Sequence, residues 1–176
     1  MSDYVFPVVK IGEVVASGDS ATAALGVGMV AEKPGKRFRL VQLSLSGGAG
    51  TTFGSGSGVE SAKEKVFEWV TEASFLVRPC NAATDRVAGV SPSETKLVLT
   101  HGDLFWLQID GLAYVVTASD GSTAAGQTVI PDDDTDLGKV TTSGGSTFTE
   151  GVTVGMALET QGSADSRAQI RLKLVP

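Results

Sequence analysis

Three aspartates spaced two residues apart are the strongest metal-binding candidates in this chain. Asp132, Asp134 and Asp136 occupy the first, third and fifth positions of a calcium-loop pattern, where carboxylate oxygens ligate the ion. The pattern then fails, because Leu137 stands where the loop needs glycine and Ser143 where it needs a bidentate glutamate. We therefore favour a solvated acidic turn, and weak calcium binding at a subunit contact is the alternative.

His101 is the single histidine, and Asp103 follows it by two residues. A serine hydrolase would also need a rigid Gly-x-Ser-x-Gly elbow between a strand and a helix, and the sequence has none. Ser55 and Ser57 lie among glycines, in a segment too loose to fix a nucleophile. One histidine and one cysteine, Cys80, are too few for a zinc site. We expect His101 to lie in a turn, with no enzymatic activity and no cofactor.

The glycines of residues 46–58 do not form a phosphate-binding loop. Gly54, Gly56 and Gly58 alternate, which is not the spacing Gly-x-Gly-x-x-Gly, and no clear strand and helix flank them. The composition predicts a flexible Gly/Ser-rich linker or contact loop.

One cluster of basic residues could bind an acidic partner. Lys33, Lys36, Arg37 and Arg39 surround a Pro-Gly turn signal and the start of a strand. The interpretation we favour is a solvated strand edge, and the alternative is a patch that meets an acidic surface such as a capsid shell.

The two tryptophans are candidates for sugar platforms, which carbohydrate-binding modules build from exposed aromatic rings. Trp69 and Trp106 both lie within apolar runs, and Trp106 is flanked by Phe105 and Leu107. A core position is therefore the better interpretation for Trp106.

Composition sets the class of the protein. The 176 residues suffice for one domain, or two small β-modules at most, and the formal net charge of −6 disfavours a nucleic acid partner. The N-terminus lacks the basic and apolar regions of a signal peptide, and no apolar run approaches the roughly 20 residues that would span a bilayer. We expect a protein made in the cytoplasm with no membrane partner.

Alternating and β-branched runs separated by turn residues predict an all-β fold, a compact antiparallel barrel or sandwich of short strands. Residues 168–174 alternate most clearly and predict a central strand that buries Ile170, Leu172 and Leu174. Asp110-Gly111 predicts a hairpin turn between strands 104–109 and 112–116. The other predicted strands cover residues 37–45, 87–90, 97–99, 127–130, 139–142 and 152–158.

Residues 61–78 admit two interpretations. Ser61 to Glu64 matches a helix capping box, and apolar residues then follow at helical spacing. The β-branched and aromatic content instead indicates two strands on either side of residues 71–73, the second ended by Pro79. We favour the strands.

The first 16 residues predict an extended N-terminal arm ahead of a β-domain at 17–176. Pro7 excludes a central strand, yet the segment is apolar, so we expect it to lie along an edge or a neighbouring subunit. The predicted capsid or intersubunit contacts are Tyr4, Val5, Phe6, Val8 and Val9 of the arm, together with Lys36, Arg37 and Arg39.

Two stretches carry a family resemblance. One is residues 38–42. The other runs from the Ala-Gly-Val of residues 88–90 through Gly102-Asp-Leu-Phe-Trp-Leu-Gln-Ile-Asp-Gly111, Ala125-Gly-Gln-Thr-Val129 and Val154-Gly-Met-Ala-Leu158 to the last strand. This order resembles the capsid decoration, or cement, proteins of tailed bacteriophages. The resemblance covers about half of the chain, and residues 46–86 fall outside it.

The resemblance implies β-barrel-like protomers, usually homotrimers, that bind the major capsid protein on the exterior of an expanded head. The expected location is therefore the virion. Two alternatives remain open: a carbohydrate-binding or adhesive β-module of a phage fibre or tail, and a hydrolase that would depend on His101.

Overall fold

The computed structural model describes residues 11, 13–16, 26–54, 61–95, 98–118, 122–132, 137–143, 149–161 and 166–174. In this part of the chain the structure is all-β, with one short 3-10 turn, η2 (Glu72–Ser74). The strands are β1 (Val30–Lys33), β2 (Lys36–Leu43), β3 (Thr52–Phe53), β4 (Val66–Thr71), β5 (Leu76–Pro79), β6 (Val87–Val90), β7 (Leu99–Thr100), β8 (Leu104–Val116), β9 (Thr128–Pro131), β10 (Val140–Thr142), β11 (Gly155–Ala157) and β12 (Arg167–Lys173).

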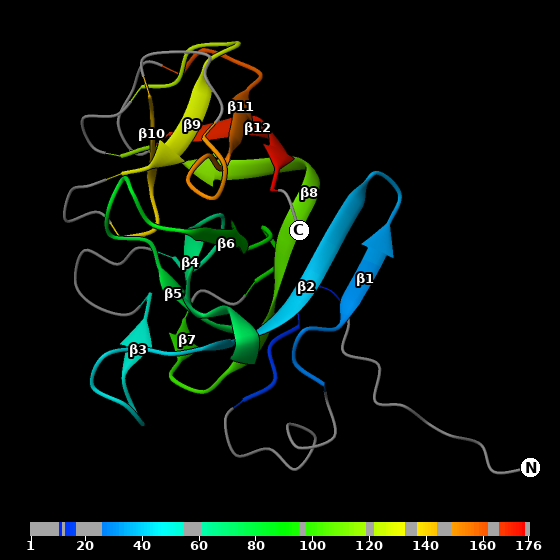
Figure 1. The fold of residues 1–176 in the computed structure, drawn as a ribbon, viewed down its shortest axis with the longest axis vertical. Coiled ribbons are helices and arrows are strands. Elements are labelled where there is room, and N and C mark those ends of the chain that lie inside the picture. The colour runs from blue at the N-terminus through cyan, green and yellow to red at the C-terminus, as the bar shows by residue number, and fades with distance from the viewer. Residues whose placement is uncertain are drawn as a thin grey trace, which may run out of the picture.

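Five strands close into a barrel in the order β2-β5-β4-β6-β8, with β8 pairing back onto β2 (Figure 1). The β2–β5 pair is parallel, and the other four pairs are antiparallel. The predicted all-β barrel is therefore confirmed. One buried cluster receives side chains from all five strands and fills the interior: Val41, Leu43, Phe67, Val77, Ala88, Phe105 and Leu107, joined by Val14, Phe53, Ala62 and Leu99.

The long strand β8 connects the barrel to the rest of the molecule. Its first half pairs with β2, and residues 110–116 pair with β12. In Figure 1 the strand bends sharply between these two halves. The prediction of a hairpin turn at Asp110-Gly111 is wrong, because β8 runs through these residues without reversing.

Gly111 explains the misleading signal. It has φ +90°, and a Cβ atom added to it would lie 2.0 Å from the carbonyl oxygen of Gly35 at the tip of the β1–β2 hairpin. Phe38 pairs with Gln108 and Arg37 with Asp110, so Ile109 is the extra residue of a β-bulge. The glycine thus permits a close approach of two backbones within a bent strand.

Beyond the bend, strands β8-β12-β11-β9-β10 form the second part of the sheet, with neighbouring strands antiparallel. An isolated bridge between Thr117 and Val140 brings β10 back to the end of β8. The last strand is central, as predicted: Ile170 and Leu172 are fully buried, and Leu174 packs against them from a half-buried position. The core of this part also contains Ala113, Val115, Val129, Val140, Val154, Ala157 and Ala168.

Strand β2 is buried on both of its faces. Val41 and Leu43 point into the barrel, whereas Phe38 and Leu40 pack outside it with Val15, Leu104 and Trp106. Val15 exchanges two backbone hydrogen bonds of 2.9 Å with Leu104, so the end of the predicted arm is paired within its own chain. Residues 1–10, which include the predicted contacts Tyr4, Val5, Phe6, Val8 and Val9, lie outside the described residues.

Residues 66–79 and residues 52–53 both form strands. Residues 66–79 form β4, η2 and β5, so the interpretation as strands is confirmed, with Pro79 as the last residue of β5. The segment 46–58 differs from a featureless linker, because Thr52–Phe53 pair with β7 and Phe53 is buried against Phe67, with 5.8 Å between ring centroids. The buried Phe53 ring and the backbone pairing with β7 together attach this part of the segment to the core. Residues 55–60 lie outside the description.

Candidate functional site

The solvent-facing side of β8, β12 and β11 exposes large apolar side chains. Leu112 is paired with Arg171, and Arg171 with Met156, so these three side chains form one row across the sheet. Tyr114 is paired with Gln169, whose carbonyl accepts the Leu158 amide proton at 3.0 Å, which gives a second row. We call these six residues the outer face.

The outer face is unusual in its exposure. Leu112, Tyr114, Met156 and Leu158 keep 41%, 37%, 45% and 41% of their side chains accessible. Their neighbours Ala113, Val115 and Ala157 point the other way, into the core. Both sides of these strand segments therefore carry apolar side chains, whereas an ordinary amphipathic strand presents polar side chains to solvent. Exposed apolar groups gathered on one surface are typical of an interaction site.

Tyr114 is held in a fixed position. The guanidinium of Arg167 lies 3.7 Å from the centre of the Tyr114 ring, and its Nε donates to Glu64 Oε2 at 2.9 Å. Ser93 Oγ donates to Glu64 Oε1 at 2.6 Å. Because Glu64 is buried, this network of charge-assisted hydrogen bonds positions Arg167 against the Tyr114 ring at one edge of the outer face.

The tip of the β1–β2 hairpin adds positive charge beside the outer face. A groove of about 630 Å³ is lined by Lys33, Lys36, Leu112 and Arg171, among others. A second groove of about 430 Å³ is lined by Lys33, Lys36, Glu94 and Tyr114, among others. The hairpin tip thus lies between two grooves, and each groove reaches an exposed side chain of the outer face.

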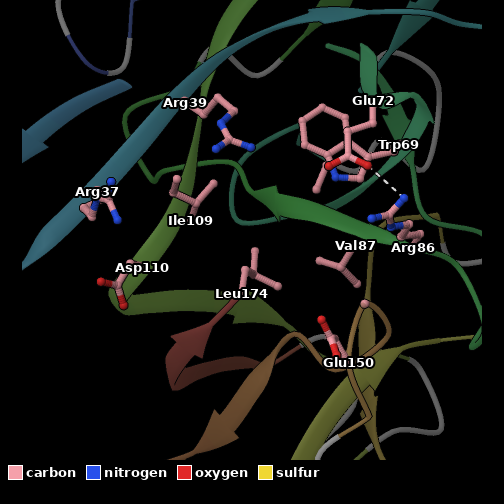
Figure 2. A pocket seen from close by; sticks show the side chains of 12 residues that line it. Arg37, Arg39, Trp69, Glu72, Arg86, Val87, Ile109, Asp110, Glu150 and Leu174 are labelled. Atoms are coloured by element: carbon pink, nitrogen blue, oxygen red, sulfur yellow. Dashed lines mark ion pairs between the residues drawn. The ribbon is translucent and has the colours of Figure 1, made fainter. Parts of the chain in front are cut away.

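The basic cluster expected from the sequence is divided by the alternation of β2. Lys33 and Lys36 lie at the hairpin tip, whereas Arg37 and Arg39 lie on the side of β2 that carries Val41 into the barrel. They line a separate pocket of about 250 Å³, which we call the barrel mouth (Figure 2). Arg37 also lines the groove of about 630 Å³ together with Lys33 and Lys36, so of the four basic residues Arg39 is the one set apart from the hairpin tip.

The barrel mouth has mixed chemistry. Arg39, Trp69, Val87 and Ile109 contribute from four barrel strands, and Leu174 and Glu150 from the second part of the structure. Figure 2 shows Arg39 and Glu150 approaching the space from opposite sides. The remaining lining residues are Arg37, Glu72, Arg86, Ala88, Asp110 and Gly151.

The metal candidate is not supported within the described residues. Asp132 is buried at the end of β9, whereas Asp134 and Asp136 lie outside the described residues. In the described part of the chain, no three His, Cys, Asp or Glu side chains come together in a way that could hold a metal ion.

His101 lies in a turn, as predicted. Its Nδ1 accepts the Leu45 amide proton at 2.9 Å, and Asp103 Oδ2 accepts the Thr100 amide proton at 2.9 Å. Both side chains therefore have backbone partners in the loops beside β2 and β7.

A buried acidic group and the buried thiol lie near one another. Arg78 Nε donates to Glu68 Oε1 at 2.6 Å, while burial raises the pKa of Glu68. Burial raises the pKa of Cys80 well above its usual range, and the carboxylates of Asp85 and Glu68 act in the same direction. A buried protonated thiol is a poor nucleophile and a poor metal ligand.

Sequence reasoning missed the outer face. The run 112–116 is apolar throughout, so polarity alone does not indicate which side of its strand faces solvent. The available signal was the size alternation of Leu112, Ala113 and Tyr114, in which a small residue is flanked by larger ones.

Comparison of the sequence with protein-family models and with curated proteins finds no match. Within the described ranges, no helix is long and apolar enough to cross a membrane.

Proposed function

We propose that this chain is a structural capsid decoration protein, which binds the exterior of an expanded phage head and stabilises it. The proposal combines the motif order of the sequence with one structural observation. That observation is the outer face, an exposed apolar surface on a rigid sheet beside the basic hairpin tip.

The mechanical properties of the fold suit such a role. A closed barrel has no free edges, and β8 continues from it into the strands that carry the outer face. Backbone pairing on both sides of β12 keeps the surface ordered before it meets a partner. A surface that is already ordered loses little entropy on binding.

The energetics favour many weak contacts. Each apolar side chain of the outer face is already about half covered, so completing its burial contributes on the order of 1 kcal/mol. One copy would therefore bind weakly through this surface. A homotrimer on a shell with repeated sites gains avidity because the second and third contacts become intramolecular.

The charge pattern indicates the kind of partner. Lys33 and Lys36 lie beside Leu112 at one edge of the outer face and Arg171 lies between Leu112 and Met156, although the whole chain carries a formal net charge of −6. Such a surface complements an acidic patch on the major capsid protein, and the charges at its rim would accelerate the encounter.

The test is cosedimentation with expanded and unexpanded capsids. We expect binding to expanded capsids, and we expect Met156→Glu to weaken it by replacing an exposed apolar side chain of the outer face with a negative charge. Val70→Glu is the matched control, because Val70 is 44% exposed on β4, outside the outer face. Equal binding by the two variants would remove the outer face from the proposal, and failure of the unchanged protein to bind would overturn the proposal itself.

A carbohydrate-binding module is the second candidate, and one observation favours it. Trp69 is half-buried and lines the barrel mouth, whereas Trp106 is 4% exposed and belongs to a core cluster. A glycan array tests for carbohydrate binding, and the cosedimentation assay tests for capsid binding. Binding that Trp69→Ala abolishes, without any capsid binding, would favour the module.

A further inference from the structure

The barrel mouth contains a buried cationic donor, Arg39 Nε, that has no hydrogen-bond acceptor among the described residues. Trp69 follows Phe67 by two residues on β4, Ile109 follows Leu107 on β8, and Arg39 precedes Val41 on β2. These three side chains therefore lie where the packed barrel interior ends. Figure 2 shows Arg39 directed into the pocket from β2.

Most polar groups of the mouth are already engaged. Arg86 Nη1 lies 2.8 Å from Glu72 Oε2, and Arg37 Nε lies 3.2 Å from Glu32 Oε1. Asp110 Oδ1 accepts the Gly111 amide proton at 2.8 Å.

Arg39 is the exception among the described cations of this pocket. Its Nε is buried and has no hydrogen-bond acceptor, and its contact in this part of the chain is the Phe75 ring, 5.9 Å from the guanidinium carbon. A buried donor without an acceptor is costly, and the flat guanidinium offers parallel N–H groups that match the two oxygens of a carboxylate.

The balance of charge selects a monoanion. Arg37, Arg39 and Arg86 contribute three positive charges to the lining, and Glu72, Asp110 and Glu150 contribute three negative ones, so the formal sum is zero. The three lining carboxylates would repel a phosphate dianion about twice as strongly as a monoanion, and the single charge of Arg39 can neutralise only the monoanion.

The other residues that line the pocket indicate which kind of molecule would carry the carboxylate. Ile109, Val87 and Leu174 offer apolar contacts, and the charged side chains Arg37, Arg86, Glu72 and Asp110 already have partners. A sugar has several hydroxyl groups that would need partners here. An acidic amino-acid side chain has one carboxylate on an apolar stem, and Glu150 could accept an amide proton from the adjoining backbone.

We propose that the barrel mouth docks an acidic side chain, aspartate or glutamate, carried by a segment of a partner protein. The carboxylate pairs with Arg39, its stem contacts Ile109 and Trp69, and a backbone amide of the segment donates to Glu150. This site is separate from the outer face and does not depend on the capsid proposal.

The probe is N-acetylglutamic acid amide, titrated at constant ionic strength while the NMR resonances of the Arg39 Nε–H and the Trp69 indole N–H are followed. N-acetylglutamine amide is the matched uncharged probe. Glucuronate and inorganic phosphate test the two other chemistries. We expect saturable shifts with the glutamate probe and at least about tenfold weaker binding of the other three.

Variants then assign the contact. Arg39→Gln should weaken glutamate binding by at least about tenfold, and Arg39→Lys should fail to restore it because the two-pronged geometry is lost. Arg171→Gln removes one positive charge from the outer face, outside the mouth, and should leave binding unchanged.

Three results would overturn the proposal: no saturable binding, tighter binding of phosphate or glucuronate, or undiminished binding by Arg39→Gln. Thermal unfolding is followed in parallel. We expect Arg39→Gln to melt no lower than the unchanged protein, because it removes a buried donor that has no acceptor. A lower melting temperature would assign Arg39 a structural role instead.

Discussion

The side chain of His101 connects two loops. By accepting the Leu45 amide proton it ties the chain after β2 to the turn before β8. We expect His101→Ala to lower the free energy of unfolding by about 1 kcal/mol, the usual contribution of such a bond, and to leave capsid binding intact. Urea unfolding and cosedimentation measure the two effects. Turnover of an esterase, glycosidase or phosphatase substrate that disappears in this variant would instead support a hydrolase.

Cys80 should make the protein sensitive to alkaline pH. Its folded-state pKa lies well above that of the unfolded thiol, so the unfolded chain loses its proton first as the pH rises. The contribution of the protonated thiol to the free energy of unfolding is fully present below the unfolded pKa of about 8.5. It is lost as the pH rises from there towards the folded pKa. Between pH 7.5 and 9.5 we expect stability to fall by about 1 kcal/mol more than in Cys80→Ala.

Urea unfolding of both proteins at the two pH values gives this difference directly, and other titrating groups cancel in it. A thiol reagent provides an independent check, since Cys80 is 1% exposed and should react only after unfolding. Equal pH dependence of the two proteins, or rapid reaction in the native state, would contradict the assignment.

The contact between the β1–β2 hairpin and the bend of β8 depends on Gly111. Alanine there would need a positive φ, which costs about 1–2 kcal/mol, and its Cβ would collide with the Gly35 carbonyl. We expect Gly111→Ala to destabilise the protein by about 3 kcal/mol or more. Gly126→Ala is the matched control, because Gly126 has φ +82° with no atom near the added Cβ. Equal losses of stability would show that the backbone contact contributes nothing.

Strands with one buried face were predictable from the sequence. The alternation of Ile170 and Leu172 with Gln169 and Arg171 specified β12 because a slip of one residue would expose its whole apolar side. Local signals did not separate a hairpin from a bend at Gly111, since both require a positive φ. The parallel β2–β5 pair joins residues more than 30 positions apart, and nothing local in either strand encodes it.

The candidate sites were harder to predict for a related reason. Lys36, Arg37 and Arg39 are neighbours in sequence, yet Lys36 lines the groove beside the outer face, Arg39 lines the barrel mouth, and Arg37 lines both. Whether an apolar residue such as Leu112 or Met156 faces solvent depends on which side of the sheet the core occupies. That is a property of the assembled strands.

At the level of the whole molecule, the two candidate surfaces have different physical characters. The outer face is broad, apolar and edged by cations, which suits repeated contacts with a shell or with other copies of the chain. The barrel mouth is smaller, and it holds Arg39, whose buried Nε has no acceptor among the described residues. A decoration protein could use the outer face to bury apolar surface area and the barrel mouth to bind one specific acidic side chain.

The predicted arm and the outer face can be separated in one assembly experiment. Ile11 packs against the cluster that contains Val15 and Phe38, so a deletion should remove residues 2–10 and keep Ile11. The deleted segment includes Tyr4, Val5, Phe6, Val8 and Val9, whose apolar side chains would each gain about 1.5–3 kcal/mol from full burial against a neighbour.

We expect the full-length chain to be a homotrimer by light scattering, and the deletion variant to dissociate while retaining the circular dichroism and melting temperature of a folded β-protein. Met156→Glu should keep the trimer if the outer face binds the shell, and should lose it if that face joins the subunits. A deletion variant that remains trimeric and sediments with expanded capsids would exclude the arm from both contacts. A full-length chain that is monomeric would contradict the trimer, because a single copy could not assemble the multivalent surface on which tight binding depends.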